Sequence, residues 1–342
     1  MFGIRTKIQR WQRYLTSSLF GPSTVRINPV GYLCNHDCPM CWRLSLSQST
    51  RQELSKQART ALSLEQYKQL LNELPRGVRE IEIVGGGEPL LFPHINELLR
   101  EIRARNLAGS LITNGARLSP TIIATLVASS WQKVRISIHA ASSKSYQAVN
   151  GRQDFEKIQT VIQQLVAARG RAVYPKIALL FVIQRDNLHE IEDFANLAQS
   201  LGVDEIQYDW LMSASPKALK LSDKQRQQVR ARLSKLHRAC QVQNNIERLL
   251  DQLAHHPNWG AKLSFQAYAQ NRYCQIALDS LEIDDHGRIL PCCIAYGTRY
   301  NYQWKQGSLW RIWQSMSPLR SRLYRGEFEP FCKGCTYNLD QR

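Results

Sequence analysis

The sequence of 342 residues contains no apolar run close to the ~20 residues that a membrane-spanning helix needs. Its N-terminus lacks an apolar segment followed by a small-residue cleavage site, so no secretory signal is expected. It also lacks internal repeats and low-complexity segments beyond a glutamine bias. With 43% hydrophobic residues, the chain can form a sizeable core, and its length predicts one large domain and one small one.

Acidic residues are scarce, with 28 Asp and Glu against 45 Lys and Arg, which gives a net charge of +17. This excess favours acidic partners such as nucleic acid, anionic lipid, phosphorylated substrates or an acidic peptide. Basic residues are concentrated in residues 1–22, which contain no acid, and in residues 216–256. A solvated helix face is the simpler explanation of both concentrations.

Residues 3–20 are predicted to form a basic amphipathic helix. Its apolar positions recur at helical spacing: Ile4, Ile8, Trp11, Leu15 and Leu19. Such a helix could make a peripheral contact with a membrane surface, but packing against the main domain is favoured. Gly21 and Pro22 end it, so residues 1–23 are predicted to be a separate N-terminal segment.

Strand and helix patterns alternate through residues 24–215. Strands are predicted at 25–33, 78–84, 109–113, 134–139, 176–183 and 205–211, and helices near 63–74, 95–106, 120–130, 154–169 and 189–201. Alternation of this kind produces parallel β/α units. Six units predict an α/β fold, a partial (β/α)6 TIM-like barrel. Residues 216–261 are predicted to be a helical connector, and residues 262–342 a small C-terminal cysteine-rich module.

Three of the nine cysteines, Cys34, Cys38 and Cys41, fall within eight residues with the spacing C-x3-C-x2-C. A [4Fe-4S] cluster usually takes one thiolate per iron, so three thiolates leave one iron open for chemistry. Zinc sites favour C-x2-C pairs that return as a second pair, which fits this spacing poorly. Clustered cysteines suit metal ligation in a reducing cytoplasm better than disulfides, so a cytoplasmic location is expected.

This motif resembles the signature of the radical S-adenosylmethionine superfamily. The resemblance implies that the open iron binds the amino and carboxylate groups of S-adenosylmethionine. It further implies that a one-electron reductant such as flavodoxin or ferredoxin drives cleavage of this cofactor to a 5′-deoxyadenosyl radical, which abstracts hydrogen from substrate. Met40 stands where the family often has an aromatic residue, and Trp42 follows the third cysteine.

A glycine run, Gly85-Gly86-Gly87, precedes Glu88 and Pro89 at the end of the second predicted strand. Glycine allows backbone groups to approach a ligand without a Cβ in the way, although a triple glycine alone most often marks a tight turn. Together with the cysteine loop, this segment resembles the GGE motif of the same superfamily. The resemblance implies that these five residues hold the methionine amino group of the cofactor.

Further candidates lie near the ends of later strands, where the active sites of β/α barrels are found. The resemblance implies that Ser137 approaches the cofactor ribose or carboxylate and that Arg152 binds the carboxylate. Asn114 and Asn187 complete the predicted cofactor-binding set. His139, placed by strand alternation on the same side as Ser137, is the candidate catalytic residue, either as a proton carrier or only as a packed neighbour.

A second cysteine set comprises Cys274, Cys292, Cys332 and Cys335. Two short predicted strands, joined by a turn at Gly287, bring Cys274 and Cys292 together. The spacing C-x12-G-x4-C followed by C-x2-C resembles the SPASM/twitch subgroup of the superfamily. This implies a second, auxiliary [4Fe-4S] cluster closed by four cysteines, with zinc as the alternative.

The resemblance implies modification of a ribosomally made peptide, by oxidation, crosslinking or epimerisation. The alternatives are dehydrogenation of an aminocyclitol or sugar and, in another class, non-enzymatic iron–sulfur or zinc binding. The net positive charge of the chain favours an acidic peptide, and a small polar substrate is the alternative. The 23 residues before the barrel are too few for a leader-binding domain, so a separate leader-binding protein is expected.

Overall fold

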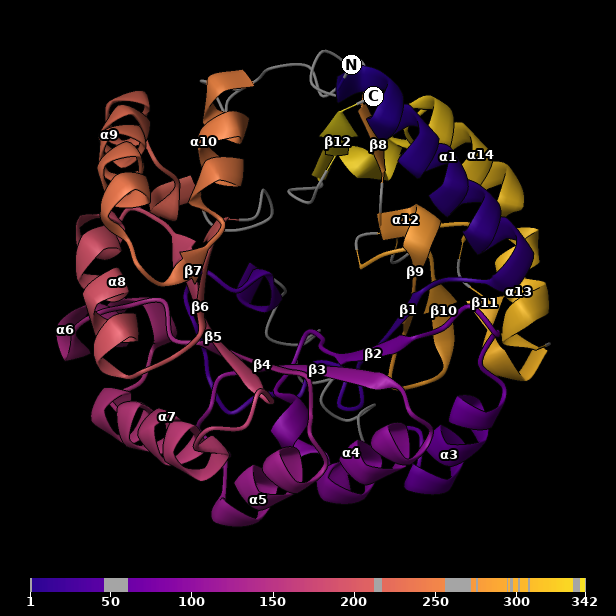
Figure 1. Ribbon diagram of the computed structural model, residues 1–342, viewed down its shortest axis with the longest axis horizontal. Helices are drawn as coiled ribbons and strands as arrows, with labels where there is room; N and C mark the ends of the chain where they lie inside the picture. The colour runs from indigo at the N-terminus through magenta and orange to yellow at the C-terminus, as the bar shows by residue number, and fades with distance from the viewer. Residues whose placement is uncertain are drawn as a thin grey trace.

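The computed structural model describes residues 2–45, 61–211 and 217–255, and in the C-terminal part 272–274, 276–293, 295, 298–300, 302–306, 308–334 and 339–341. Its main sheet curves into a partial barrel, with the strand order β11-β10-β9-β1-β2-β3-β4-β5-β6-β7 (Figure 1). Six parallel neighbours form the centre of this sheet: β1 (Thr24–Ile27), β2 (Glu80–Ile83), β3 (Ala108–Thr113), β4 (Lys133–Ser137), β5 (Lys176–Ile183) and β6 (Glu205–Trp210). The predicted partial (β/α)6 barrel is therefore confirmed.

The connecting helices cover the outside of the barrel (Figure 1). They are α3 (Leu64–Asn72), α4 (Ile95–Ala104), α5 (Pro120–Ala128), α6 (Ser143–Asn150), α7 (Phe155–Arg169) and α8 (Ile191–Ser200). The start of α3 is a capping box, in which Ser63 and Gln66 each accept a hydrogen bond from the other's backbone N–H. The sequence prediction missed α6, a short helix.

The loops also contain short 3-10 helices: η1 (Trp42–Ser45), η3 (Pro89–Leu91), η4 (Leu188–Glu190), η5 (Lys217–Leu219), η6 (Trp304–Gln306) and η7 (Pro330–Gly334).

Side chains alternate between the two faces of each strand. Phe181 on β5 and Tyr208 on β6 contact Phe194 of α8, with ring centroids 4.7 and 6.1 Å apart, so this set faces the helices. Their strand neighbours therefore face the barrel interior. In β2, whose sequence is Glu-Ile-Glu-Ile, the isoleucines belong to the apolar core and Glu82 lies on the interior side.

The described part of the predicted helical connector is not one helix. It consists of α9 (Asp223–Ala239), β7 (Gln243–Asn244) and α10 (Ile246–His255). β7 extends the sheet parallel to β6. The side-chain amide of Asn245 continues this pairing, because it accepts from the Tyr208 N–H and donates to the Tyr208 carbonyl, both at 2.8 Å. β7 consists of two polar residues and therefore carries no hydrophobic pattern from which a strand could be predicted.

The C-terminal part contains β8 (Arg272–Cys274), α12 (Ile276–Asp279), β9 (Ser280–Ile283), β10 (Arg288–Leu290), β11 (Tyr302–Gln303), α13 (Leu309–Ser315), α14 (Ser317–Arg325) and β12 (Leu339–Gln341). The predicted hairpin is present as β9–β10, and Gly287 in its turn has a φ of 72°. β9 pairs in parallel with β1. One sheet thus runs across the predicted boundary between barrel and module.

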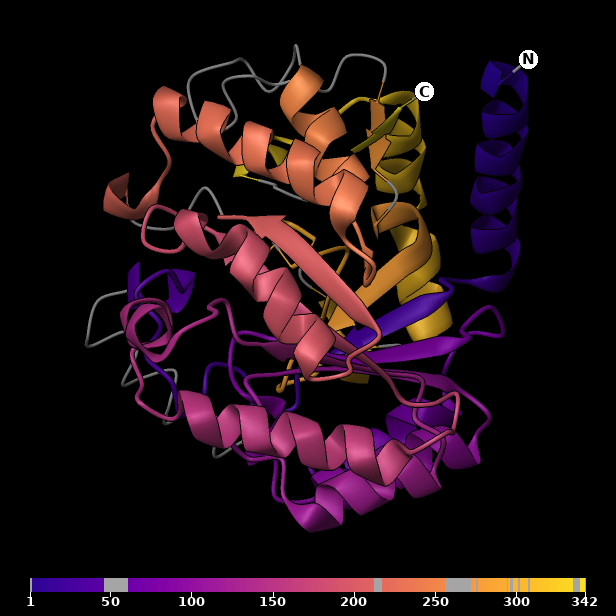
Figure 2. The same ribbon diagram turned by 60° about the vertical axis from the view of Figure 1, so that its left-hand side comes forward.

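The N-terminal helix α1 (Phe2–Phe20) lies along the C-terminal helices (Figures 1 and 2). The Trp313 indole donates to the Ser17 carbonyl at 2.7 Å, and the Gln314 amide donates to the Ser18 carbonyl at 3.1 Å. The helix therefore packs against the rest of the protein as favoured, but through its polar side. No helix in the described part of the chain is long and apolar enough to cross a membrane.

Gly31, in the loop after β1, gives a test of how this loop packs on the β9–β10 hairpin. Its φ is 56°, and a Cβ added to it would lie 2.3 Å from Oδ2 of the buried Asp285. We expect Gly31→Ala to lower the free energy of unfolding by about 1–3 kcal/mol more than Gly202→Ala. Gly202 has a φ of 69°, but its nearest contact would be an ordinary 3.5 Å. Equal losses in chemical denaturation of the two variants would contradict this packing.

Candidate active site

The first cysteine loop leaves the carboxyl end of β1, the edge of a parallel barrel at which active sites form. Backbone hydrogen bonds fold it into consecutive turns: the N–H of Cys41 donates to the Cys38 carbonyl at 2.8 Å, and the N–H of Leu44 donates to the Cys41 carbonyl at 2.9 Å. Cys34, Cys38 and Cys41 are all half-buried and form no disulfide. The structure therefore presents three free thiols on one short loop.

The three thiols affect one another electrostatically. Burial, followed by the neighbouring Cys41 and Cys34, raises the pKa of Cys38 to about 12. Burial also raises the pKa of Cys34, against the lowering effects of the His36 backbone N–H and Arg43. Such thiols lose their protons readily only when a positively charged partner, such as a metal ion, stabilises the thiolates that remain.

The three sulfur atoms are not grouped as a single zinc ion would require. A single tetrahedral zinc with ~2.3 Å bonds needs sulfurs about 3.8 Å apart. Within the described residues, the group of three or more ligand atoms lying within 4.8 Å of one another is Asp284, Asp285 and His286, and the cysteines do not form such a group. Three free thiols on one loop are the donor type and number that would hold a [4Fe-4S] cluster at three corners.

Glu88 connects the loops that follow β1, β2 and β3 at the carboxyl ends of these strands. Its carboxylate accepts hydrogen bonds from the Leu90 N–H at 3.0 Å, the Thr113 hydroxyl at 2.6 Å and the Asn114 N–H at 2.7 Å. Its own N–H donates to the Leu33 carbonyl at 2.8 Å in the cysteine-bearing loop. Burial raises the pKa of Glu88, and these three donors lower it. A ligand ammonium would therefore share a carboxylate that already orders the loops.

The glycines before Glu88 allow two loops to pack against each other. A Cβ at Gly85 would lie 2.1 Å from the side chain of Asn28, and one at Gly87 would lie 2.1 Å from the Leu33 carbonyl. Asn28 is itself buried, and its amide donates to the Gly31 carbonyl at 3.0 Å. Here the glycine run serves close approach within the protein, a need that spacing alone does not distinguish from ligand binding.

Two asparagines lie beside the thiols. The amide nitrogen of Asn114 is 4.0 Å from the Cys34 sulfur and donates to the Asn35 side chain at 2.8 Å. The Cys38 sulfur is 3.9 Å from the side-chain oxygen of Asn150. Asn114 was predicted at this site. Asn150, the last residue of α6, was missed, because its contact depends on a helix that the sequence did not reveal.

His36, inside the cysteine loop, is buried, and its Nε2 is 3.8 Å from Asp154 at the start of α7. Burial lowers the pKa of His36, and the Asp154 carboxylate offsets this in part. Neither imidazole nitrogen has a hydrogen-bond partner among the described residues, so His36 packs against the segment between α6 and α7 without being bonded to it. Gly151 contributes to the same packing, since a Cβ there would lie 2.8 Å from the Asp37 carbonyl.

His139 lies beyond the end of β4, with a φ of 55°. The strand alternation that was used to align it with Ser137 therefore does not extend to it, and that premise is wrong. Burial lowers the pKa of His139 to about 4, and its Nδ1 accepts the Val182 N–H at 3.2 Å. The imidazole is thus neutral near pH 7, with one nitrogen already in use.

The remaining predicted cofactor-binding residues differ in burial and in hydrogen bonding. Ser137 is half-buried on the interior side of β4, and Arg152 is exposed in the loop before α7. Asn187 is fully buried, and its amide bonds to backbone groups of Gln184, His139 and Val182. The described contacts of Asn187 hold the loop after β5 in place.

The barrel interior is lined by charged side chains, whereas closed barrels usually fill this space with branched apolar ones. Glu82 of β2 pairs with both Arg26 of β1 and Arg135 of β4, and Arg135 also donates to Ser110 of β3 at 3.0 Å. Glu282 of β9, the register neighbour of Arg26, is 5% exposed, and its Oε2 has no hydrogen-bond partner. This charged layer was not among the features predicted from the sequence.

The second cysteine set is described in part. Cys274 packs against a small apolar cluster that contains Cys332, so both belong to the same part of the C-terminal module. Leu339, four residues beyond Cys335 in the sequence, pairs with Cys274 between β12 and β8. Cys292 follows β10 and is half-buried. Cys335 itself lies outside the described residues.

A sequence model of the Radical SAM superfamily matches residues 28–198, half of the chain. The mycofactocin maturase MftC of Mycobacterium tuberculosis is 30% identical over 171 residues, which are 50% of this chain and 40% of the maturase. The AdoMet-dependent heme synthase of Methanosarcina barkeri is 29% identical over 170 residues, 49% of this chain and 45% of that enzyme. The chain thus aligns with less than half the length of these relatives.

Two solved structures resemble the fold over most of the chain. Streptococcus suis SuiB bound to its precursor peptide SuiA has a TM-score of 0.67, 15% identity and coverage of 97% of this chain and 76% of SuiB. The enzyme anSMEcpe with bound AdoMet has a TM-score of 0.63, 14% identity and coverage of 92% of this chain and 88% of that one. At such identities the likeness shows the fold.

Glu282 gives the interior layer a testable pH dependence. Burial, opposed by Arg26 and aided by Asp284, raises its pKa from 4.5 to about 7. Between these values the unfolded chain releases a proton that the folded chain keeps, so the free energy of unfolding should fall as pH rises. The total fall is about 3 kcal/mol.

We expect Glu282→Gln to remove this fall, so that the variant gains stability relative to wild type from pH 5 to pH 8. The measurement is the melting temperature of both proteins, reconstituted and kept anaerobic. Glu97→Gln, on the exposed side of α4, is the matched control. A difference between Glu282→Gln and wild type that stays constant with pH would refute this origin of the stability change.

Proposed function

Because the chain belongs to the Radical SAM superfamily, we propose that it is an enzyme that acts on a ribosomally made peptide. When bound, the cluster and S-adenosylmethionine supply a 5′-deoxyadenosyl radical that abstracts hydrogen. The observation that carries the proposal is the placement of Cys34, Cys38 and Cys41 on one half-buried loop at the carboxyl end of β1, beside Glu88.

The roles of this chain's own residues follow from their positions. The three thiols hold the cluster, and Asn114 and Asn150 border two of them. Glu88 and the Gly85–Gly87 turn form the wall on which the cofactor's amino group is held. Ser137, on the interior side of β4, and Arg152, in the loop before α7, complete the cofactor site. His139 and Asn187 hydrogen-bond to backbone groups of β5 and of the loop after β4, and so hold the neighbouring loops in position.

The proposed substrate is a polar, preferably acidic peptide. SuiB was solved with a precursor peptide, and anSMEcpe has also been solved with a peptide bound. The charged barrel interior offers both signs of charge to a polar chain, and the net charge of +17 favours an acidic one. The comparisons do not favour an aminocyclitol or sugar substrate. A reductant such as flavodoxin or ferredoxin, and a separate leader-binding protein, belong to the same proposal.

We further propose that Cys274, Cys292, Cys332 and Cys335 hold an auxiliary [4Fe-4S] cluster. The shared packing of Cys274 and Cys332 supports this ligand set. Four thiolates close such a cluster, which suits it to accept an electron from the substrate or to anchor the module.

Anaerobic reconstitution followed by reduction with S-adenosylmethionine tests the enzyme class. Wild type should release 5′-deoxyadenosine, and Cys38→Ala should release at least about 100-fold less, because even residues that only support a metal ligand are worth 10–100-fold. Cys240→Ala is the matched control, since this half-buried cysteine donates to the Val242 carbonyl away from both sets. No 5′-deoxyadenosine from wild type would instead favour a non-enzymatic iron–sulfur protein.

Metal analysis of the same preparations tests the auxiliary site. Two clusters predict about eight irons per chain. The double variant Cys332→Ala/Cys335→Ala leaves only two thiolates in the second set and should reduce this to about four while 5′-deoxyadenosine release persists. About four irons with one zinc in wild type would identify the second site as a zinc site. About four irons without zinc would remove the second site from the proposal.

A further inference from the structure

The apolar side of α1 faces away from the protein. Eight large hydrophobic side chains are exposed in the described part of the chain, and four of them lie on this one helix: Ile8, Trp11, Leu19 and Phe20. Ile8, Trp11 and Leu19 are 51, 54 and 65% exposed. At ~100° per residue, positions 8, 11, 15 and 19 fall within an arc of about 80°, so they form one stripe.

The orientation of α1 is fixed by contacts on its polar side. Ser17 is buried, and its carbonyl accepts from the Trp313 indole. The ring of Tyr14 packs on that of Tyr324, with centroids 4.6 Å apart. Helices on protein surfaces ordinarily turn their apolar stripe inward. Here the inward side is the polar one, which leaves the stripe available for another surface.

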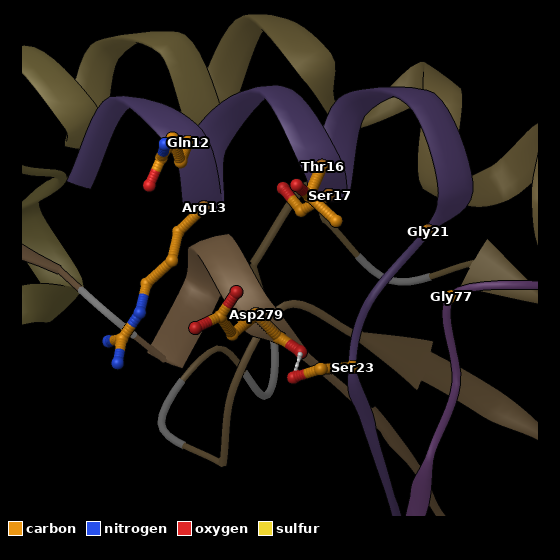
Figure 3. A pocket seen from close by; sticks show the side chains of 8 residues that line it. All are labelled: Gln12, Arg13, Thr16, Ser17, Gly21, Ser23, Gly77 and Asp279. Atoms are coloured by element: carbon orange, nitrogen blue, oxygen red, sulfur yellow. Dashed lines mark hydrogen bonds between the residues drawn. The ribbon is translucent and has the colours of Figure 1, made fainter. Parts of the chain in front are cut away.

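The space between α1 and the body of the protein is also polar (Figure 3). A pocket there is lined by Gln12, Arg13 and Thr16 from the helix and by Ser23, Gly77 and Asp279 from the body. The Ser23 hydroxyl donates to the Asp279 carbonyl at 3.2 Å. Rotating the helix to bury its stripe would place apolar side chains against these polar groups, so the observed orientation is the favourable one.

We propose that α1 docks this enzyme onto an anionic lipid surface. The helix carries Arg5, Lys7, Arg10 and Arg13 and no acidic residue. A basic amphipathic helix with Trp and Leu on its apolar side lies in the plane of a membrane interface, where the basic residues attract anionic headgroups.

The geometry favours lipid over other occupants. α1 is the outermost element on its side of the molecule, so a flat surface can approach it (Figure 2). A second copy would bring two wholly basic helices together, which charge repulsion opposes. The stripe from Ile8 to Leu19 is also only about 16 Å long, small for a stable protein interface.

Vesicle co-sedimentation of the full-length, cluster-loaded protein tests this proposal. Wild type should bind vesicles of phosphatidylglycerol and phosphatidylcholine, bind pure phosphatidylcholine weakly, and lose binding as salt increases. The double variant Trp11→Ser/Leu19→Ser keeps every charge and should weaken binding at least about tenfold.

The matched control is Val173→Ser/Tyr174→Ser, which also removes one exposed aliphatic and one exposed aromatic side chain, 63 and 41% exposed, in the loop before β5. It should bind like wild type. Absence of wild-type binding, equal loss in both variants, or equal binding to neutral vesicles would overturn the proposal. So would a wild-type dimer in sedimentation velocity that Trp11→Ser/Leu19→Ser converts to a monomer.

Reductive cleavage of S-adenosylmethionine without vesicles should be the same in wild type and both double variants. This readout separates the lipid proposal from the proposed function. Failure to bind vesicles with intact cleavage rejects only the docking surface, whereas vesicle binding without any cleavage rejects only the enzyme.

Discussion

The arrangement of the loops at the carboxyl ends of β1, β2 and β3 depends on the hydrogen bonds of one buried residue, Glu88. It receives hydrogen bonds from the loops after β2 and β3, while its own N–H reaches the loop after β1 that carries the cysteines. Desolvating a carboxylate costs several kcal/mol unless donors compensate. Three donors do so here only when the loops are correctly placed. The energetic need of this side chain therefore fixes the loops after β2 and β3 relative to each other, and the Glu88 N–H adds the loop after β1.

Much of the fold was predictable because its determinants are local. The bounds of β5 agree residue for residue with the predicted strand, whose apolar run is bounded by turns, and the start of α3 follows from the Ser63–Gln66 pair. β1 instead ends at Ile27, short of the predicted residue 33. Asn28 donates its N–H to Ile283 of β9, and the chain then turns. That partner is far away in the sequence and invisible to a local pattern.

The candidate site divides in the same way. The cysteine spacing and the glycine run are local signals, and they single out the loop after β1 and the loop after β2 that packs on it. Whether a polar residue serves a ligand or the protein depends on contacts made in three dimensions. Asn187 has the composition of a binding residue, yet its amide bonds to three backbone groups. The interior charges of β1, β2 and β4 could have been inferred, because each alternates with core residues along its strand.

The C-terminal module is joined to the cysteine loop through the sheet itself. β9 pairs with β1 along its length, the Leu62 N–H donates to the Asp285 carbonyl at 2.7 Å, and Gly31 leaves room for the Asp285 side chain. Strand pairing resists bending far more than a flexible linker does. Cys274 and Cys292 flank this hairpin in sequence, so the second cysteine set is connected to the barrel through a strand pairing. A packing change at Asp285 therefore acts directly on the loop that carries Cys34.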